Sequence, residues 1–139
     1  MKFLHSMVRV KDLDASMKFY GEVLGLKEAK RSEYPQWKCT LVYLEANPGE
    51  GQIELTYNWG QEEDYTLGNS FGHLAFEVDD IYEACQKAKD AGVLINRPPH
   101  DGYMAFFKSP DGISIELLQK GEKLEPKEPW ASMENTGSW

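Results

Sequence analysis

The stretch FGHLAFEVDDIYEACQKAKDAG, residues 71–92, joins the two patterns that decide the fold. Its first part, residues 72–78, alternates between polar and apolar side chains, which is typical of a half-buried strand. An acidic pair, Asp79 and Asp80, then precedes an apolar helical stripe, and Gly92 follows it. Acidic residues before a helix and a glycine after it are ordinary helix boundaries. The stretch therefore predicts a strand followed by a helix.

A second copy of this order lies upstream, where a strand at 3–10 precedes a helix between Asp12 and Gly25. Each helix is followed by three predicted strands, at 27–34, 37–46 and 51–58 in the first copy and at 94–97, 103–108 and 113–119 in the second. Both copies end in Ile-Glu-Leu, at 53–55 and 115–117. A repeat of this length indicates a duplicated half-domain rather than a solenoid array. The predicted fold class is α+β, built from paired βαβββ modules.

The chain is expected to form a single domain over residues 1–120. Its half-modules are 1–58 and 72–119, and the polar segment 59–71 is the linker between them. Each half is too small to form a core alone. The segment 121–139 is a charged tail that is either disordered or lies over the body, with Trp130 and Trp139 as candidate anchors.

Composition excludes several classes of protein. The 139 residues carry 15 Lys and Arg against 23 Asp and Glu, a formal net charge of -8, so nucleic acid and anionic membranes are not expected partners. No apolar run approaches the roughly 20 residues that cross a bilayer. We expect a cytoplasmic protein whose two cysteines, Cys39 and Cys85, are small buried hydrophobic residues. A catalytic cysteine or a disulfide is the alternative interpretation.

Alternation along the strands sorts the polar side chains onto one face. His5 lies opposite Leu4, Val8 and Val10, which take the core face, and Glu54 shares a face with Asn58. By the same reasoning His73 and Glu116 lie opposite the apolar residues of their strands. Each half thus contributes one His from its first strand and one Glu from its last.

Those four side chains predict a metal site. Any one of them alone is what a solvated sheet displays, but all four are metal-competent and occupy matching places in two copies of one motif. Two imidazoles and two carboxylates suit nickel, cobalt, zinc, iron, manganese or magnesium, and leave positions open for water or substrate. A carboxylate beside such a metal is equipped for proton transfer next to a carbonyl group.

The segments HSMVRVKDLDASMKFYGEVLGLK, IELTYNWG, FGHLAFEVDDIYEAC and SPDGISIELL resemble glyoxalase I, the lactoylglutathione lyase of the vicinal oxygen chelate superfamily. The resemblance covers residues 1–119. It implies that the βαβββ pair forms a cupped mixed sheet. It also implies isomerisation of the thiohemiacetal of methylglyoxal and glutathione to S-lactoylglutathione.

The resemblance also assigns residue roles. The metal ligands fall on His5, Glu54, His73 and Glu116. Glu116 matches the base that removes the C1 proton, Glu54 participates in proton return at C2, and Arg9 and Asn58 match positions that hold the thiol. His5 stands where the zinc-using branch has Gln, so nickel is the first choice of metal, followed by cobalt and then zinc. A homodimer is expected.

Several alternatives stay open at this point. The net charge of -8 gives little long-range attraction for anionic glutathione, so another low-molecular-weight thiol is an alternative substrate. Other activities are those of an epimerase or a thiol transferase of the same superfamily, and a non-catalytic binding module is a further rival. His100 is interpreted as a surface residue of a mobile flap, with a proton shuttle as the alternative. Trp59 is either core or pocket wall.

Overall fold

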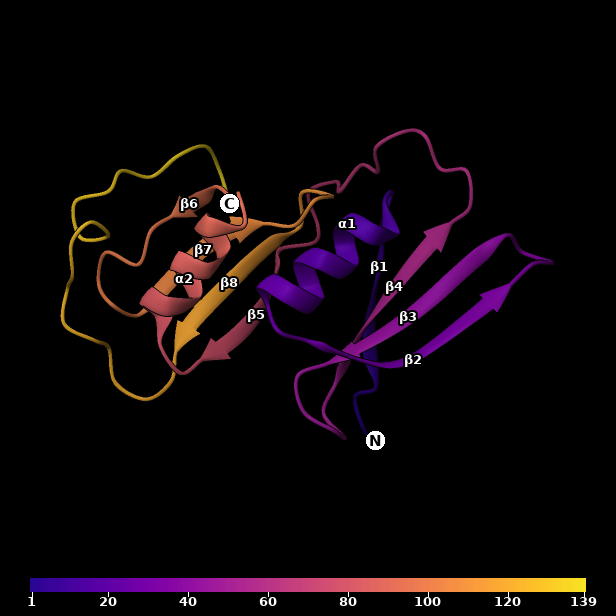
Figure 1. Cartoon of the computed structure of the whole chain (residues 1–139), viewed down its shortest axis with the longest axis horizontal. Helices are drawn as coiled ribbons and strands as arrows, with labels where there is room; N and C mark the ends of the chain where they lie inside the picture. The colour runs from indigo at the N-terminus through magenta and orange to yellow at the C-terminus, as the bar shows by residue number, and fades with distance from the viewer. The chain divides into compact units, whose positions relative to one another are not determined.

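The computed structural model describes all residues from 1 to 139 and divides into two compact units, unit 1 (Met1–Thr66) and unit 2 (Leu67–Trp139). The boundary falls inside the predicted linker 59–71. Both units have the predicted βαβββ order, and every strand begins and ends within two residues of its expected bounds (Figure 1). The prediction of an α+β fold made of paired modules is therefore confirmed.

Unit 1 consists of β1 (His5–Arg9), α1 (Leu13–Met17), η1 (Lys18–Val23), β2 (Lys27–Tyr34), β3 (Cys39–Glu45) and β4 (Gln52–Asn58). Its helix begins as predicted, because the Asp12 carboxylate accepts a hydrogen bond of 2.9 Å from the Ala15 N–H. One helix was expected up to Gly25. Instead α1 gives way to the wider η1, a π-helix, before Gly25 ends it in the left-handed region at φ 77°.

Unit 2 repeats the plan with β5 (His73–Val78), α2 (Ile81–Asp90), β6 (Ile95–Arg97), β7 (Met104–Lys108) and β8 (Ser114–Gln119). Asp80 caps α2 by accepting from the N–H groups of Tyr82 and Glu83 at 2.8 and 3.1 Å. Gly92, at φ 84°, follows its end. The acidic starts and terminal glycines of both helices thus act as the sequence predicts.

The two sheets have the same strand order. In unit 1 it is β1-β4-β3-β2, and in unit 2 it is β5-β8-β7-β6. The first and last strands of each unit run parallel and pair with each other, whereas the remaining strands form antiparallel hairpins. A parallel pair needs a long crossover connection, which the helix and two middle strands provide in each unit. This pairing places the two Ile-Glu-Leu strands beside the two His-bearing strands.

Apolar side chains fill one face of each sheet. In unit 2, α2 packs over β7 and β8, and Cys85, Phe107 and Ile115 are fully buried there. Cys39 is buried in unit 1, so both free cysteines are the small hydrophobic residues expected, and burial raises the pKa of Cys85 to about 12. Leu4 is a correction: alternation predicts it on the core face, but it precedes β1 and is 64% exposed.

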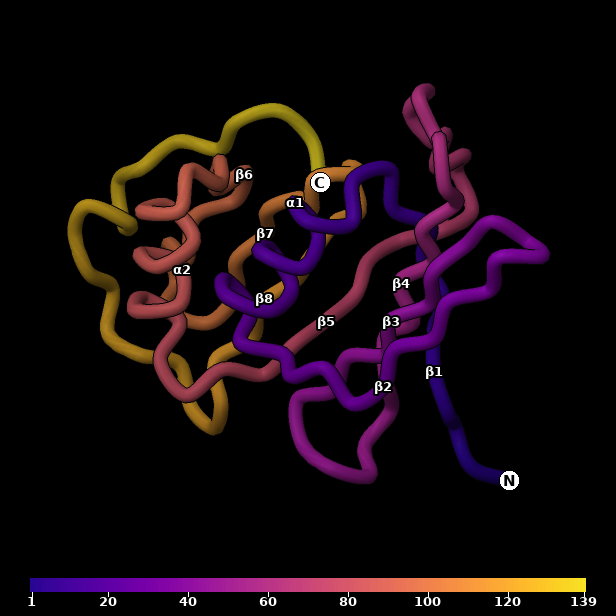
Figure 2. Tube along the Cα trace, turned by 45° about the vertical axis from the view of Figure 1, so that its right-hand side comes forward, coloured from indigo at the N-terminus to yellow at the C-terminus, as the bar shows by residue number.

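The tail 121–139 lies over unit 2, which settles the choice left open for it (Figure 2). Trp130 is only 3% exposed and carries the Lys89 ammonium 5.7 Å from its ring centre, while Trp139 stacks on Phe106. Both predicted anchors are therefore in place. Gly102, at φ 70°, lets the tail approach, because a Cβ there would collide with the Leu124 carbonyl.

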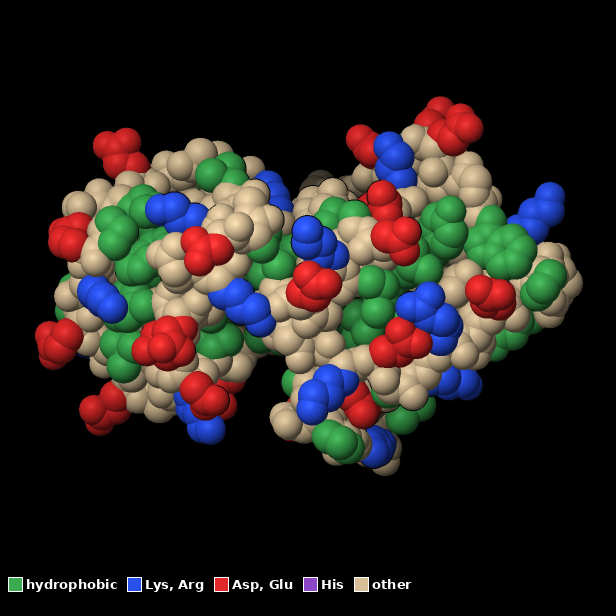
Figure 3. All heavy atoms as spheres, in the orientation of Figure 1, with side chains coloured by type: hydrophobic (Ala, Val, Ile, Leu, Met, Phe, Trp, Pro, Cys, Tyr) green, Lys and Arg blue, Asp and Glu red, His purple; other side chains and the backbone are tan.

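Basic and acidic side chains are interspersed on the molecular face in Figure 3, without a basic cluster. No helix has the length and apolar content that crossing a membrane requires.

Candidate functional site

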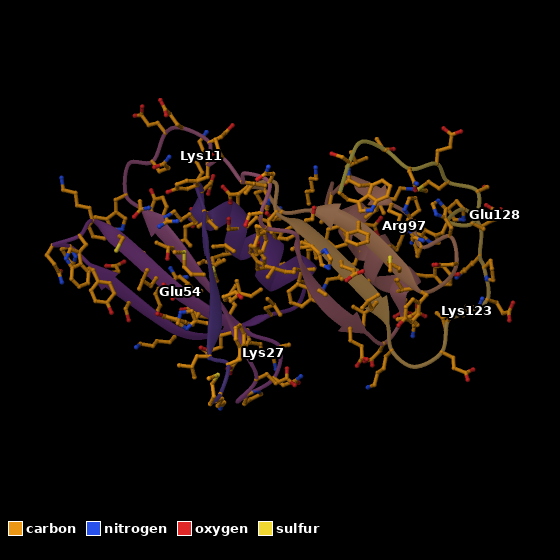
Figure 4. The ribbon with its side chains drawn as sticks, turned by 180° about the vertical axis from the view of Figure 1, so that it is seen from behind. Lys11, Lys27, Glu54, Arg97, Lys123 and Glu128 are labelled. Atoms are coloured by element: carbon orange, nitrogen blue, oxygen red, sulfur yellow. The ribbon has the colours of Figure 1, made fainter.

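A His–Glu pair lies on the sheet of unit 1. The Nε2 atom of His5 is 2.9 Å from Oε2 of Glu54, which is labelled in Figure 4. Parallel pairing sets His5 opposite Gln52, so Glu54 stands two residues further along the neighbouring strand on the same face. The carboxylate is largely buried, with 11% of its side chain exposed, whereas His5 is 37% exposed. A buried carboxylate thus holds a more accessible imidazole.

Unit 2 contains the matching pair. Here Nε2 of His73 lies 3.1 Å from Oε2 of Glu116, and the exposed fractions of the side chains are 43% and 12%. The register is the same, because His73 pairs with Ser114 and Glu116 is again two residues further along. The equivalence predicted from the repeat is therefore present in side-chain geometry as well as in strand order.

The four predicted ligands form two His–Glu pairs, one in each unit. The pairs are His5 with Glu54 and His73 with Glu116, and no group of three or more His, Cys, Asp or Glu side chains forms a metal site. Each unit by itself holds one half of the predicted donor set. We call the pair His5 and Glu54 the unit 1 half-site, and the pair His73 and Glu116 the unit 2 half-site.

An aromatic ring touches each imidazole edge to face. In unit 1 it belongs to Tyr43, at 5.5 Å between ring centres and 77° between planes. In unit 2 it belongs to Phe106, at 5.5 Å and 82°. Each ring lies directly opposite its half-site glutamate in the antiparallel ladder, so it faces the same side of the sheet. Neither ring is among the predicted site residues, although the hairpin register opposite each Ile-Glu-Leu would have located them.

Glu54 has further hydrogen-bond partners. The Thr56 hydroxyl donates to its Oε1 at 3.2 Å, and the Tyr43 hydroxyl forms a hydrogen bond with the same carboxylate. Burial raises the pKa of Tyr43, and the negative charge of Glu54 and this hydrogen bond raise it further. Phe106 offers no hydroxyl to Glu116. Glu54 is thus the more firmly held of the two carboxylates.

Arg9 and Asn58 belong to the unit 1 half-site face. Arg9 is exposed at the end of β1 and pairs in register with Thr56, while Asn58 ends the adjacent strand β4. The amide of Asn58 donates to the Tyr65 hydroxyl at 3.0 Å. These polar groups therefore lie at one end of the two strands that carry His5 and Glu54. Tyr65 is a further residue of this face that was not predicted. Strand periodicity could not reveal it, because it follows β4 in an irregular segment.

A hollow of about 370 Å³ opens beside His5 in unit 1. Its walls include Tyr43, Gln52 and the side chains of Lys2 and Lys30. The Lys30 ammonium lies 5.9 Å from the Tyr43 ring centre, so a cation covers the ring that touches His5. Glu45 and Glu50 also line the hollow, so the surroundings of this half-site carry charges of both signs.

The structure also decides between the alternative interpretations of His100 and Trp59. His100 does not belong to a free flap. Its Nε2 is hydrogen-bonded to the Met133 carbonyl of the tail, and Asp101 of the same loop pairs with Arg97 at the end of β6. That tertiary bond could not be read from the loop sequence. Trp59 is 38% exposed and donates from its ring nitrogen to the Thr40 hydroxyl at 2.8 Å, so it is partly exposed rather than core.

Comparison with known proteins matches this arrangement to one superfamily. A family model described as the Glyoxalase/Bleomycin resistance protein/Dioxygenase superfamily matches residues 2–117. The chain is 44% identical over 126 residues to the lactoylglutathione lyase of Haemophilus influenzae, covering 86% of this chain and 93% of that protein. It is 41% identical over 136 residues to the probable lactoylglutathione lyase of Synechocystis sp., covering 90% of this chain and 100% of that protein.

Solved structures give the same result. The glyoxalase I of Leishmania major, described as trypanothione-dependent, matches with a TM-score of 0.82 at 40% identity, covering 86% of this chain and 87% of that chain. Glyoxalase I from Zea mays matches with a TM-score of 0.80 at 35% identity, covering 90% of this chain and 47% of that one.

Proposed function

Because the chain belongs to the lactoylglutathione lyase (glyoxalase I) family of the glyoxalase superfamily, we propose that it isomerises the methylglyoxal–glutathione thiohemiacetal to S-lactoylglutathione. The observation that carries this proposal is the pair of half-sites. Each half-site sets an imidazole nitrogen against a carboxylate oxygen at an equivalent register. Together the two pairs would supply a mixed nitrogen and oxygen donor set for a metal ion.

The spacing inside each half-site suits two adjacent ligands of a divalent ion. Ligand bonds of ~2.1 Å at right angles place neighbouring donor atoms about 3 Å apart. The observed separations between Nε2 and Oε2 are 2.9 and 3.1 Å, so each pair is spaced as two adjacent ligands would be. We assign His5, Glu54, His73 and Glu116 as the ligands. Imidazole and carboxylate suit nickel, cobalt and zinc. Nickel is the first choice, then cobalt and then zinc, because the first ligand is His5 and not the Gln of the zinc-using branch.

The bound ion would supply charge stabilisation for the oxygens of the substrate as an enediolate develops. The proton transfers fall to the carboxylates. Glu116 removes the proton from C1, the carbon that bears the sulfur, and Glu54 takes part in its return to C2. The structure supports this division, because Glu54 has hydrogen bonds from Thr56 and Tyr43, whereas the ring opposite Glu116 carries no hydroxyl. The less restrained carboxylate is the better candidate for the moving base.

Arg9 and Asn58 are proposed to hold the thiol. Both stand at the same end of the unit 1 half-site face, where a guanidinium and an amide can bind a carboxylate and an ammonium group of glutathione. Glutathione is the first choice, as the names of the bacterial relatives suggest. The net charge of -8 and the trypanothione-dependent relative keep a different low-molecular-weight thiol as the second candidate.

A homodimer is proposed as the working form, with the two units serving as one glyoxalase-type domain. The maize glyoxalase I chain supports it, because this chain covers 47% of that one and two copies would be needed to match its length. A complete donor set needs a unit 1 half-site and a unit 2 half-site together. Light scattering of the metal-loaded protein measures the dimer directly, and a monomer that is active at high dilution would refute it.

Reconstitution of metal-free protein tests the function. Methylglyoxal and glutathione are supplied with nickel, cobalt or zinc in turn, and thioester formation is followed by absorbance. We expect the highest turnover with nickel and less with zinc. Turnover that is absent with glutathione but present with trypanothione would change only the thiol. Absence of turnover with every metal and both thiols would refute the proposed function.

A further inference from the structure

The tail 121–139 passes around the edge of the unit 2 sheet. Its early part lies against the helix side, where the Tyr82 hydroxyl donates to the Glu125 carbonyl at 2.7 Å and Trp130 is buried. It then meets the edge strand β6: the Thr136 N–H donates to the Asn96 carbonyl at 2.8 Å, and the Asn96 amide donates to the Thr136 carbonyl at 2.9 Å. The tail thereby covers an otherwise open sheet edge.

Beyond that edge the tail reaches the half-site face. Trp139 stacks on Phe106, with 6.3 Å between ring centres and 30° between planes. Phe106 lies opposite Glu116 on the ladder and touches His73, while its neighbour Phe107 points to the other face and is fully buried in the core. The tail therefore begins on the helix side of the sheet and places an indole on the side that carries the metal ligands.

The rings of Trp139 and Phe106 form an apolar wall beside the unit 2 half-site. Trp139 is 43% exposed, so part of its ring is accessible to a ligand. The guanidinium of Arg97, on the adjacent strand of this hairpin, is already occupied by the Met104 carbonyl and the Asp101 carboxylate. In the unit 1 half-site the group nearest the face of the aromatic ring is instead a cation, the Lys30 ammonium, 5.9 Å from the Tyr43 ring centre. The charges of both signs around the unit 1 half-site suit a thiol that carries carboxylate and ammonium groups, and the apolar rings of unit 2 suit an apolar group.

We infer that Trp139 is a specificity-determining residue that binds the apolar substituent carried by the carbonyl carbon of the substrate. The inference rests on the proposed function, since it assigns one part of that substrate to one wall of the same site. A larger substituent contacts more of the indole. The enzyme should therefore prefer an aromatic oxoaldehyde adduct to the methyl one, by an amount that depends on Trp139.

Kinetics with two thiohemiacetals test the inference. Wild type, Trp139→Ala, Trp139→Phe and the matched tail control Glu134→Gln are assayed with methylglyoxal and phenylglyoxal adducts of one thiol. Trp139→Ala should lower the ratio of kcat/KM for phenylglyoxal to that for methylglyoxal about 10-fold, mostly through KM. Trp139→Phe should restore most of it, and Glu134→Gln, an exposed side chain, should leave it unchanged. Equal loss on both adducts would show a merely structural role and overturn the inference.

Binding of thiol-free chelators separates this inference from the proposed function. Acetohydroxamate and benzohydroxamate present the same two oxygens to the nickel-loaded protein and differ only in a methyl or phenyl substituent. Calorimetry should show tighter binding of benzohydroxamate, and the preference should fall about 10-fold in Trp139→Ala but persist in Glu134→Gln. A preference that is absent in the wild type, or that survives Trp139→Ala, overturns the role of Trp139. Wild-type protein that shows the preference but no turnover refutes only the isomerase function.

Discussion

The unit 1 and unit 2 half-sites have the same backbone register and different surroundings. Each sets an imidazole Nε2 against a glutamate Oε2 on a parallel strand pair, and each places an aromatic ring at the imidazole edge. In unit 1 the ring is Tyr43, which bonds to its glutamate and lies under Lys30. In unit 2 it is Phe106, which lies under Trp139. The repeat therefore duplicates the pairing geometry, and the residues around each pair distinguish the two carboxylates, for which we propose different roles.

Removing each carboxylate in turn gives the sharpest test of this comparison. Glu116→Gln should lower kcat about 1,000-fold while metal stays bound, because an amide cannot accept the C1 proton. Glu54→Gln should instead mainly weaken metal binding, because the firmly held carboxylate is chiefly a ligand. Steady-state kinetics on metal-saturated variants, with metal content measured in parallel, distinguish the two. Equal losses of kcat and metal in both variants would contradict the division of roles.

The tail creates a second asymmetry, in stability. Trp130 is 3% exposed, and the tail 121–139 that carries it belongs to unit 2 (Figure 2). Trp130→Ala should lower the free energy of unfolding by about 3–5 kcal/mol, as expected for a buried aromatic side chain. Urea unfolding measures this loss, and hydrogen exchange should place it in unit 2. Trp37→Ala is the matched control: Trp37 is 70% exposed, so its removal should change stability by less than ~0.5 kcal/mol.

Exchanging the two rings should partly exchange the half-site properties. Phe106→Tyr brings a hydroxyl to the ring opposite Glu116, and a hydrogen bond to the base should lower kcat about 10-fold. Tyr43→Phe removes a hydrogen bond from Glu54 and should weaken metal binding by about 3- to 10-fold with a smaller effect on kcat. Kinetics together with metal titration of both variants give the comparison. An increase of kcat in Phe106→Tyr would mean that Glu116 benefits from restraint.

The smallest expected effect concerns acid stability, and it too belongs to unit 2. Burial raises the pKa of Asp101, but hydrogen bonds from the N–H groups of Tyr103 and Met104, together with Arg97, lower it overall. A lowered folded-state pKa stabilises the native state above the ordinary value of about 3.9, and this stabilisation is lost as the pH falls through the folded-state pKa. Because the Asp101 side chain is 45% exposed, the contribution should be below ~1 kcal/mol.

Asp101→Asn checks this sign, because the amide keeps an oxygen acceptor but does not titrate. Urea unfolding at pH 6 and pH 3 should show a smaller acid-induced loss of stability in the variant than in the wild type. The exposed Glu28 of unit 1, whose pKa is lowered by its hydrogen bond to Arg31, provides the control through Glu28→Gln, with a still smaller effect. A greater acid sensitivity of Asp101→Asn would contradict the assignment.

Much of the fold follows from local sequence. Alternation located the strands, and the Asp12 and Asp80 caps marked the starts of both helices. Local rules did not predict the π-helical turn after Met17, nor the exposure of Leu4 just before β1. A short apolar alternation cannot tell where pairing stops, because that depends on the partner strand.

The residues of the candidate site that match between the two copies of the repeat were predicted from the sequence. His5, Glu54, His73 and Glu116 occupy equivalent positions in the two copies, and their pairing within each unit follows from strand order. Tyr43 and Phe106 also occupy equivalent positions, but they differ in residue type, and Trp139 has no counterpart in unit 1. Locating the two rings requires the hairpin register, and the contact of Trp139 depends on the course of the tail, so alternation along a single strand marks none of them.

By itself the sequence determined the duplicated βαβββ plan, the helix caps and the two His–Glu pairs as candidate ligands, because alternation and capping depend on neighbouring residues. Only the tertiary structure decided which side chains surround those pairs. The antiparallel register set Tyr43 and Phe106 opposite the two glutamates, and the course of the tail around β6 brought Trp139 onto Phe106. Contacts between residues far apart in the chain arise from packing and edge pairing, which no local pattern encodes.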